Sequence, residues 1–184
     1  MDLSESQLAR ARAKAKDARV AVEFIQADAR ELNYRGEFHL ALIICEGAFP
    51  LMETDRENFR ILSGAAVSLQ PGGRLILTTL NVLFPLFHSV KDFVSGDMVT
   101  GETLGHSFDL MTFRGHSILE IANDSGRMRK LTCNERYYAP SEIAWLLESL
   151  GFSKAEIFGG VTGAFSRSKP LTHEDFEMLV VAAK

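Results

Sequence analysis

Asp2 is the residue whose type and place most clearly suggest chemistry. It directly precedes a predicted helix capped by Ser4, so it reads as the last residue of a strand. A carboxylate at the tip of such a strand can accept hydrogen bonds from both hydroxyls of a ribose. A first strand and a glycine-rich turn normally precede such an acid by about 20 residues. In this sequence only Met1 precedes Asp2.

The two cysteines do not suggest a metal or a disulfide. Cys45 and Cys133 lie far apart, and neither belongs to a C-x-x-C pair. Zinc sites and disulfide frameworks normally show closer or more numerous cysteines. The sequence therefore predicts no metal site, and it favours a reducing compartment.

Composition limits the classes of partner. The 184 residues are 46% hydrophobic and 24% charged, with a formal charge of −4, which is typical of one soluble domain over residues 1–184. Binding along a nucleic-acid backbone relies on clustered Lys and Arg, so no nucleic-acid partner is expected. The basic stretch 10–16 is flanked by acids and lacks a following apolar core, so it predicts a solvated helix face. No window reaches the ~18 apolar residues of a membrane span. We expect a cytoplasmic protein.

The amino-terminal half alternates predicted helices and strands. Ser4 and Gln7 form a capping box for a helix over about 5–17, and Thr54 and Glu57 form another for a helix that Pro71-Gly72-Gly73 ends. β-Branched and apolar runs predict strands at three places, the second of them buried on both faces. These strands are residues 20–26, 38–45 and 74–80.

The carboxyl-terminal half changes character after Asn81. Residues 82–105 predict helix and mobile loop, and residues 106–138 predict an antiparallel insertion of three strands. A helix follows from Pro140 to Leu150. The predicted insertion strands are 107–113, 117–121 and 127–132, with turns at 114–115 and 123–126, and two closing strands are 155–158 and 176–182. Together the elements predict an α/β fold.

Five segments in order resemble the class I, Rossmann-like methyltransferases that depend on S-adenosylmethionine, especially the small-molecule members. The resemblance covers almost the whole chain and implies a Rossmann-like sheet, truncated at its amino terminus, with S-adenosylmethionine as cofactor. The segments are Asp2-Leu3-Ser4 with the helix ending Ala-Arg-Ala-Lys-Ala; Phe24-Ile25-Gln26-Ala27-Asp28-Ala29; Phe38 to Cys45; Leu69-Gln70-Pro71-Gly72-Gly73-Arg74-Leu75; and Arg136-Tyr137-Tyr138-Ala139-Pro140-Ser141-Glu142.

The resemblance implies roles for particular residues. Asp2 matches the acid that receives both ribose hydroxyls, although an exposed acid at a helix start is the alternative. Asp28 matches the acid that meets the adenine amino group, with the Ala29 amide near the ring; a turn residue is the alternative. The loop Cys45-Glu46-Gly47 matches the segment that lines the methionyl half of the pocket, and Glu46 is its best polar candidate.

Catalysis by this family needs the sulfonium methyl held in line with a nucleophile, so placement supplies much of the rate. Tyr137 and Tyr138 precede the Pro140 helix where the family often closes its pocket, and either could hold an acceptor. We take Tyr137 and Glu46 as the catalytic candidates. His88, His106 and His116 are weaker ones.

Two departures from the family pattern bear on binding. The first strand, the glycine-rich loop, the next helix and most of the second strand are absent, so a monomer is expected to bind the cofactor poorly. The segment could be missing from the natural protein, removed by design, or lost because translation was assigned to start at Met1. In the last case we expect the missing strand, turn and helix to be encoded upstream. His39 stands where the family usually has Asp. The stretch 159–163 cannot obviously replace the missing loop.

Three functions compete. The leading one is methyl transfer to a small-molecule acceptor; a non-catalytic, dimerising interaction module and a nicotinamide-dependent oxidoreductase are the others. The missing strands would leave a hydrophobic edge on the strand at 38–45, and the connection 27–37 is short for a parallel crossover. We therefore expect a homodimer or larger assembly through residues 20–45.

Overall fold

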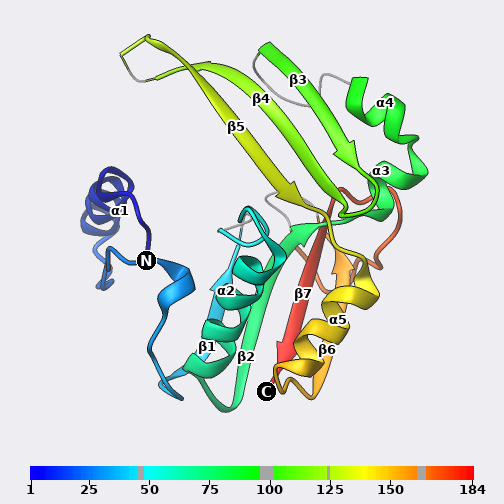
Figure 1. The fold of residues 1–184 in the computed structure, drawn as a ribbon. Coiled ribbons are helices and arrows are strands. Elements are labelled where there is room, and N and C mark those ends of the chain that lie inside the picture. The colour runs from blue at the N-terminus through cyan, green and yellow to red at the C-terminus, as the bar shows by residue number, and fades with distance from the viewer. Residues whose placement is uncertain (45–47, 96–101, 124, 161–164) are drawn as a thin grey trace.

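A computed structural model describes residues 1–44, 48–95, 102–123, 125–160 and 165–184. Its main sheet has four strands in the order β1-β2-β7-β6 (Figure 1). β1 and β2 are parallel, and β7 runs antiparallel to both of its neighbours, β2 and β6. The strands span Phe38–Ile43 (β1), Leu69–Leu80 (β2), Lys154–Gly159 (β6) and Glu177–Ala183 (β7).

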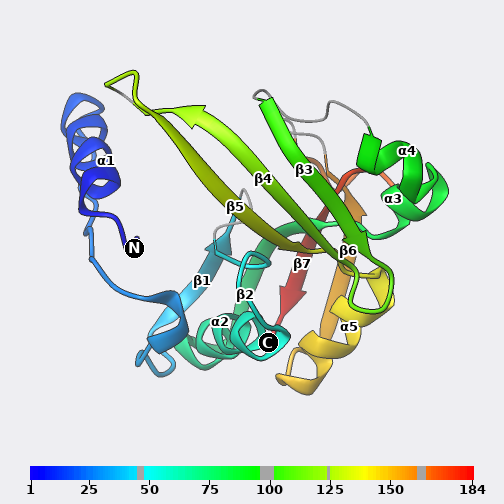
Figure 2. The ribbon, with the colours of Figure 1, turned by 45° about the horizontal axis from the view of Figure 1, so that its top comes forward.

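The main core lies between this sheet and two helices on one of its faces. α2 and α5 lie side by side there (Figures 1 and 2). Leu75 and Val180 of the sheet and Leu62 and Ile143 of the helices are fully buried in one apolar cluster. The helices span Asp55–Ser68 (α2) and Pro140–Ser149 (α5). The α/β class that the sequence predicts is confirmed.

A second, three-stranded antiparallel sheet lies between α4 and α5 in the chain. Its order is β3-β4-β5, and it extends away from the carboxyl ends of β1 and β2 (Figure 1). We call it the insertion sheet. Its strands span Glu102–Asp109 (β3), Arg114–Ala122 (β4) and Met128–Arg136 (β5); the preceding helices are Leu83–Phe87 (α3) and Val90–Ser95 (α4).

The antiparallel prediction is confirmed, but its first turn was placed too late. Arg114 and Gly115 lie inside β4, paired with Asp109 and Phe108, so residues 110–113 make the turn. The Arg-Gly pair resembles a turn locally, yet its cross-strand neighbours hold it in the sheet. How the chain divides into domains, including an insertion over 106–138, stays a prediction.

The amino-terminal segment stands apart from both sheets. α1 (Glu5–Asp17) begins at Ser4, whose hydroxyl accepts a hydrogen bond from the Gln7 amide, as predicted. Figures 1 and 2 both show this helix away from the rest of the molecule. Leu8 alone of its residues is buried. Within the described residues, no helix is long and apolar enough to cross a membrane.

The predicted strand at 20–26 does not form. These residues carry no strand assignment, and only Gln26 makes an isolated parallel bridge, to Asp2. A β-strand requires a neighbouring backbone, and among the described residues β1 pairs with β2 alone. The strand prediction was wrong because the sequence pattern is present but the partner is not.

Candidate functional site

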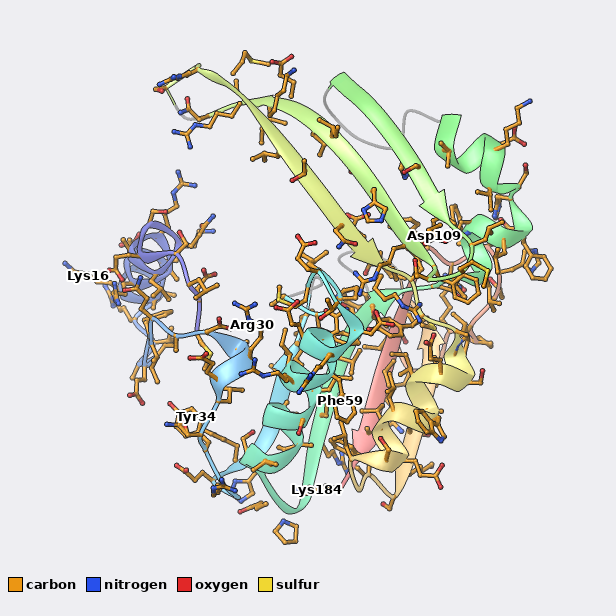
Figure 3. The ribbon with its side chains drawn as sticks, viewed as in Figure 1. Lys16, Arg30, Tyr34, Phe59, Asp109 and Lys184 are labelled. Atoms are coloured by element: carbon orange, nitrogen blue, oxygen red, sulfur yellow. The ribbon has the colours of Figure 1, made fainter. Side chains whose placement is uncertain are left out.

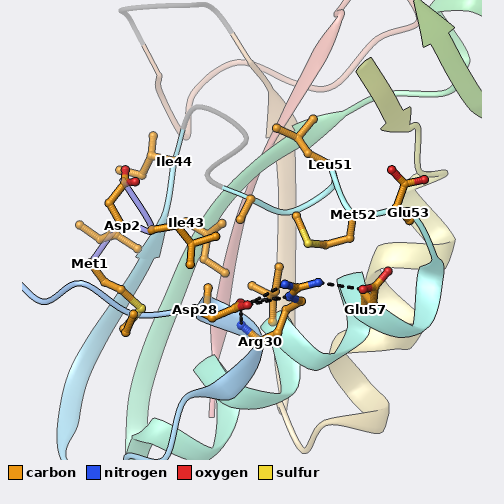
Figure 4. Close-up of a pocket in the computed structure, with 16 residues that line it drawn as sticks. Met1, Asp2, Asp28, Arg30, Ile43, Ile44, Leu51, Met52, Glu53 and Glu57 are labelled. Atoms are coloured by element: carbon orange, nitrogen blue, oxygen red, sulfur yellow. Dashed lines mark hydrogen bonds and ion pairs between the residues drawn. The ribbon is translucent and has the colours of Figure 1, made fainter. Parts of the chain in front are cut away.

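A pocket of about 590 Å³ lies at the carboxyl end of β1 (Figure 4). Three parts of the chain meet around it: the amino terminus, the short helix η1 (Ala29–Glu31), and the segment after β1. The lining residues are Met1, Asp2, Leu3, Ala27, Asp28, Ala29, Arg30, Leu42, Ile43, Ile44, Ala48, Leu51, Met52, Glu53, Glu57 and Ile61. Asp2, Asp28 and Ala29, predicted from sequence as binding residues, therefore line one pocket.

Asp2 is fixed through its backbone. Its amide donates to the Ile25 carbonyl at 3.2 Å, and its carbonyl accepts from the Ala27 amide at 3.2 Å. Its carboxylate accepts a hydrogen bond from the Ser4 amide through Oδ1 at 2.8 Å and is exposed. The side chain thus lies at the pocket wall on a braced backbone, with acceptor capacity left for further hydroxyl donors.

Asp28 is held by an arginine that sequence analysis missed. Its Oδ1 accepts from the Arg30 amide at 2.9 Å, capping η1, and the Arg30 Nη2 donates to its Oδ2 at 2.6 Å. These bonds lower the pKa of Asp28 to about 2, so the carboxylate is ionised at neutral pH. The sequence does contain a signal for this pair: an acid directly after a predicted strand, followed two residues later by an arginine.

Arg30 also joins η1 to α2. Its Nη1 donates to Glu57 Oε1 at 2.8 Å, and Figure 3 shows Arg30 between η1 and that helix. Glu57 is also the acid of the capping box predicted for α2, and its Oε2 accepts a hydrogen bond from the Thr54 hydroxyl at 3.1 Å. This bond and that from Arg30 keep the pKa of Glu57 below its usual value. The pocket floor is thus an acid–arginine–acid chain that fixes η1 in place.

Part of the predicted site cannot be placed. Cys45, Glu46 and Gly47 lie outside the described residues. The residues on either side of them, Ile44 and Ala48, both line the pocket. The roles of these three therefore stay predictions.

The two tyrosines are buried and do not line this pocket. Tyr138 is 2% exposed, its ring stacks on Phe49 with centroids 5.0 Å apart, and its hydroxyl accepts from Asn58 Nδ2 at 3.2 Å. Burial raises its pKa above the usual range. Tyr138 is thus a core residue. Tyr137 is 1% exposed and packs against Phe108 of the insertion sheet.

Three titratable side chains gather over β4 of the insertion sheet. A Cβ at Gly115 would lie 3.3 Å from Tyr137 Cε2, 3.8 Å from His106 Nε2 and 4.0 Å from Glu135 Oε2. Burial raises the pKa of Glu135 and lowers the pKa of His106. The neutral forms of both are therefore favoured. Glu135 was not singled out from sequence, because its place beside Gly115 follows from the register of β4 and β5.

A second pocket, of about 510 Å³, lies on the insertion sheet and shares Glu53 with the first. Asn134 Nδ2 donates to Glu53 Oε2 at 3.2 Å. His106, His116 and Cys133 also line it. His88 lies elsewhere, where its Nδ1 contacts the Phe84 carbonyl oxygen at 2.9 Å. Of the three weaker histidine candidates, two therefore line a pocket.

Two buried arginines fasten the insertion sheet to the body that carries the first pocket. Arg114 Nη2 donates to Asp55 Oδ1 at 2.5 Å and its Nη1 to the Met52 carbonyl at 2.8 Å. Arg136 pairs with Glu142, and its guanidinium lies 4.5 Å from the ring centroid of Tyr138. Paired charges of this kind fix the orientation of the two sheets. Among the described residues, no group of three or more His, Cys, Asp or Glu could hold a metal ion.

The comparisons with known proteins agree on one fold. Residues 1–73 match the family described as a methyltransferase domain. An S-adenosylmethionine-dependent methyltransferase of Clostridium acetobutylicum superposes with a TM-score of 0.71 at 12% identity, covering 98% of this chain and 72% of that one. The chain has the class I S-adenosylmethionine-dependent methyltransferase fold. The Rossmann-like methyltransferase fold that the sequence resemblance implies is thereby confirmed.

Two further methyltransferases share this fold. The CcbJ methyltransferase of Streptomyces caelestis gives a TM-score of 0.69 at 16% identity, over 97% of this chain and 75% of that one. An S-adenosylmethionine-dependent methyltransferase of Methanosarcina mazei gives 0.61 at 15% identity, over 100% and 79%. A search of curated proteins finds no match.

The matched methyltransferases of Clostridium acetobutylicum and Methanosarcina mazei are described as S-adenosylmethionine-dependent, and the first pocket has a size and side chains suited to a nucleoside. Its volume lies within the range of about 300–1,000 Å³ that is usual for small-molecule sites. Asp2 and Asp28 supply carboxylates of the kind that bind ribose hydroxyls and an adenine amino group, while Leu42 and Met52 offer apolar surface for a ring. The described lining contains no glycine-rich turn for the amino-acid end.

Proposed function

We propose that this chain binds S-adenosylmethionine in the 590 Å³ pocket and transfers its methyl group to a small-molecule acceptor. The observation that carries the proposal is the meeting of Asp2 and Asp28 in one pocket, although 26 positions separate them in the chain. Each was expected from the sequence to bind a different part of the nucleoside. We also propose that the protein acts in the cytoplasm, where Cys133 would remain a thiol.

The residues of the pocket would divide the nucleoside between them. Asp2, on its braced backbone, would take the ribose hydroxyls, and Asp28 would accept from the adenine amino group. Arg30 holds Asp28 ionised, which strengthens such an acceptor. The Ala29 amide at the start of η1 would lie beside the ring.

Bound S-adenosylmethionine supplies an electrophilic methyl group on a positive sulfur. Asp2 and Asp28 would hold its nucleoside, and it would give the methyl group to the acceptor's lone pair and leave as S-adenosylhomocysteine. The chain must hold the acceptor in line with the methyl group, which is a task of placement. An acceptor that carries a proton must also lose it.

The acceptor would lie toward the insertion sheet, where the second pocket shares Glu53 with the first. Glu46 and Tyr137 remain the proposed catalytic residues. Tyr137 would act with Glu135, whose Oε2 lies 3.5 Å from its hydroxyl. Burial raises the pKa of Glu135 and so favours its neutral form, which suits a group that exchanges a proton with Tyr137.

Calorimetric titration with S-adenosylhomocysteine separates the proposal from its rival, a non-catalytic interaction module. Micromolar binding supports the methyltransferase, and no heat at millimolar ligand supports the module. A second assay supplies methyl-labelled S-adenosylmethionine with mixtures of small molecules carrying oxygen, nitrogen, carbon or sulfur nucleophiles. Binding without label transfer would support the cofactor site and would show that the proposed acceptor class is wrong.

A further inference from the structure

Glu53 lies between the two pockets. Among the described residues, it alone lines both the first pocket (Figure 4) and the second pocket on the insertion sheet. A ligand that binds Glu53 from the second pocket would therefore lie next to the space proposed for the cofactor. The inference drawn from this position rests on the proposed function, because it concerns which acceptor the second pocket would take.

A chain of hydrogen bonds holds the Glu53 carboxylate in place. Arg114 Nη1 donates to Asn134 Oδ1 at 3.0 Å, so the amide of Asn134 turns its Nδ2 the other way. That Nδ2 donates to Glu53 Oε2 at 3.2 Å. Arg114 is itself fixed by Asp55 and by the Met52 carbonyl. A carboxylate can accept about four hydrogen bonds, so Glu53, which is exposed, has acceptor capacity for a ligand.

The formal charge of the second pocket is negative. Glu53 supplies it, and neither Lys nor Arg is among the described lining residues. Each cation on the same face of β4 and β5 has an acid beside or opposite it: Arg114 with Asp55, Arg136 with Glu142, and Lys130 with Glu120. The pocket therefore favours a cationic ligand and disfavours carboxylates and phosphates.

The other side chains of the second pocket suit a small molecule with an apolar part. His116 lies opposite Asn134, and Ile118 lies opposite Thr132. Directly opposite residues of an antiparallel pair share one face, so these four side chains point to the same side of the sheet. Ile118 is 41% exposed and offers apolar surface beside hydrogen-bonding groups. A carbon frame can pack there while its polar end reaches Glu53.

We propose that Glu53 selects the methyl acceptor, and that the acceptor is a small amine whose cationic nitrogen donates to this carboxylate while its carbon frame lies on Ile118. A primary ammonium first gives one proton to water. The nitrogen lone pair then becomes the bond to the methyl carbon as S-adenosylhomocysteine leaves, and the product is a secondary ammonium. An alcohol of the same shape can also donate to Glu53, but it lacks the charge that strengthens the bond.

Three ligands that share one carbon frame test this choice. At neutral pH benzylamine is a cation, benzyl alcohol is neutral and benzoate is an anion. NMR of the isoleucine methyl groups reports both pockets, because Ile118 lines the second, Ile61 lines the first, and Ile143 is buried in α5. Benzylamine should shift Ile118 with a dissociation constant about 10-fold or more below that of benzyl alcohol, and Ile143 should not move. Benzoate should bind most weakly.

Variants of Glu53 test its part in the selection. Glu53→Gln keeps the size of the side chain and removes its charge, so the preference for benzylamine over benzyl alcohol should disappear. Glu53→Lys should reverse the order, with benzoate binding more tightly than benzylamine. Glu148→Gln is the matched control, because Glu148 is exposed on α5 and lines neither pocket. It removes the same charge and should leave the preference unchanged.

The same spectra separate this inference from the proposed function, because S-adenosylhomocysteine should shift Ile61 in the wild-type protein. Suppose that it does, but that benzylamine shows no preference, shifts Ile61 in place of Ile118, or keeps its preference in Glu53→Gln. The inference about the acceptor is then wrong, while the cofactor site is supported. If S-adenosylhomocysteine shifts no isoleucine, the proposed function is wrong, and the role of an amine as methyl acceptor is overturned with it.

Discussion

β7 and residues 20–26 have similar sequences, but only β7 forms a strand. Both are seven-residue runs rich in valine and other apolar side chains. β7 lies between β2 and β6, and its Met178, Val180 and Ala182 are fully buried. In residues 20–26, Phe24 and Ile25 are half-buried, the other five residues are exposed, and only Gln26 is bridged. The comparison teaches that a strand pattern specifies a strand only where a neighbouring backbone exists to complete it.

The largest expected difference is between two leucines on adjacent strands. Leu77→Ala on β2 removes a side chain that is 0% exposed and should lower the free energy of unfolding by about 2–5 kcal/mol. Leu40→Ala on β1, 47% exposed, should cost less than about 1 kcal/mol in the monomer. Urea unfolding of dilute protein measures both. Equal losses would mean that Leu40 is already covered.

Arginines give the next contrast. Arg136→Met removes a guanidinium that is 5% exposed and pairs with Glu142, so stability should fall by about 2 kcal/mol; Glu142 is itself 33% exposed and can be rehydrated in part. Arg12→Met on α1 breaks an exposed pair with Glu5 and should change stability by less than about 1 kcal/mol. Thermal unfolding of both variants checks the order. A larger loss from Arg12→Met would contradict the view that α1 stands apart.

Asp28→Ala should weaken binding of S-adenosylhomocysteine by about 10- to 100-fold, because a polar partner of the ligand is lost. Asp109→Ala is the matched control, since Asp109 caps a turn through the Met111 amide at 2.8 Å but lies outside the pocket. Calorimetry compares the two. An unchanged dissociation constant in a folded Asp28→Ala protein would remove this residue from the site.

The ion pair of Asp28 and Arg30 also predicts a pH dependence. Because the folded pKa of Asp28 is lowered to about 2, its contribution to stability is complete above the unfolded value near 3.8 and is lost as pH falls through about 2. NMR titration of the Asp28 carboxyl carbon should give a midpoint near 2. A midpoint near 3.8 would show that Arg30 does not hold it in solution.

The smallest effect concerns His88. Its bond to the Phe84 carbonyl and its pair with Glu174 raise its pKa, so any stability it contributes is present below its ordinary pKa and is lost as pH rises through the raised value. Glu174→Gln should move the NMR titration midpoint of His88 downward. An unchanged midpoint would show that Glu174 does not interact with this imidazole in solution.

Local signals predicted much of the fold. The capping residues Ser4 and Thr54 gave the starts of α1 and α2, and apolar runs gave β1 and the second part of β2. These features depend on neighbours within a few residues, which the sequence displays directly. The expected burial of β1 on both faces was wrong, and Pro71-Gly72-Gly73, expected to end the helix, lie inside β2. The failures at 20–26 and at Arg114-Gly115 both depended on which backbone lies alongside.

In the candidate site too, residues in local patterns could be predicted and contacts between distant residues could not. Asp2, Asp28 and Ala29 line the first pocket together, and each ends a short segment that resembles methyltransferase sequences. The bond from Arg30 to Glu57 could not be predicted, since it depends on side-chain geometry across 27 positions, whereas the bond from Arg30 to Asp28 spans only two. The gathering of His106 and Glu135 at Gly115 depended on the strand register, which the misplaced turn obscured.

Hydrogen exchange with and without S-adenosylhomocysteine tests the central claim most directly, because it reports where the ligand lies. The account predicts slower exchange at residues 1–3, 27–30 and 48–53, which line the first pocket, and no change in α5. Protection confined to the insertion sheet, or no protection at saturating ligand, would contradict the assignment of this pocket to the cofactor.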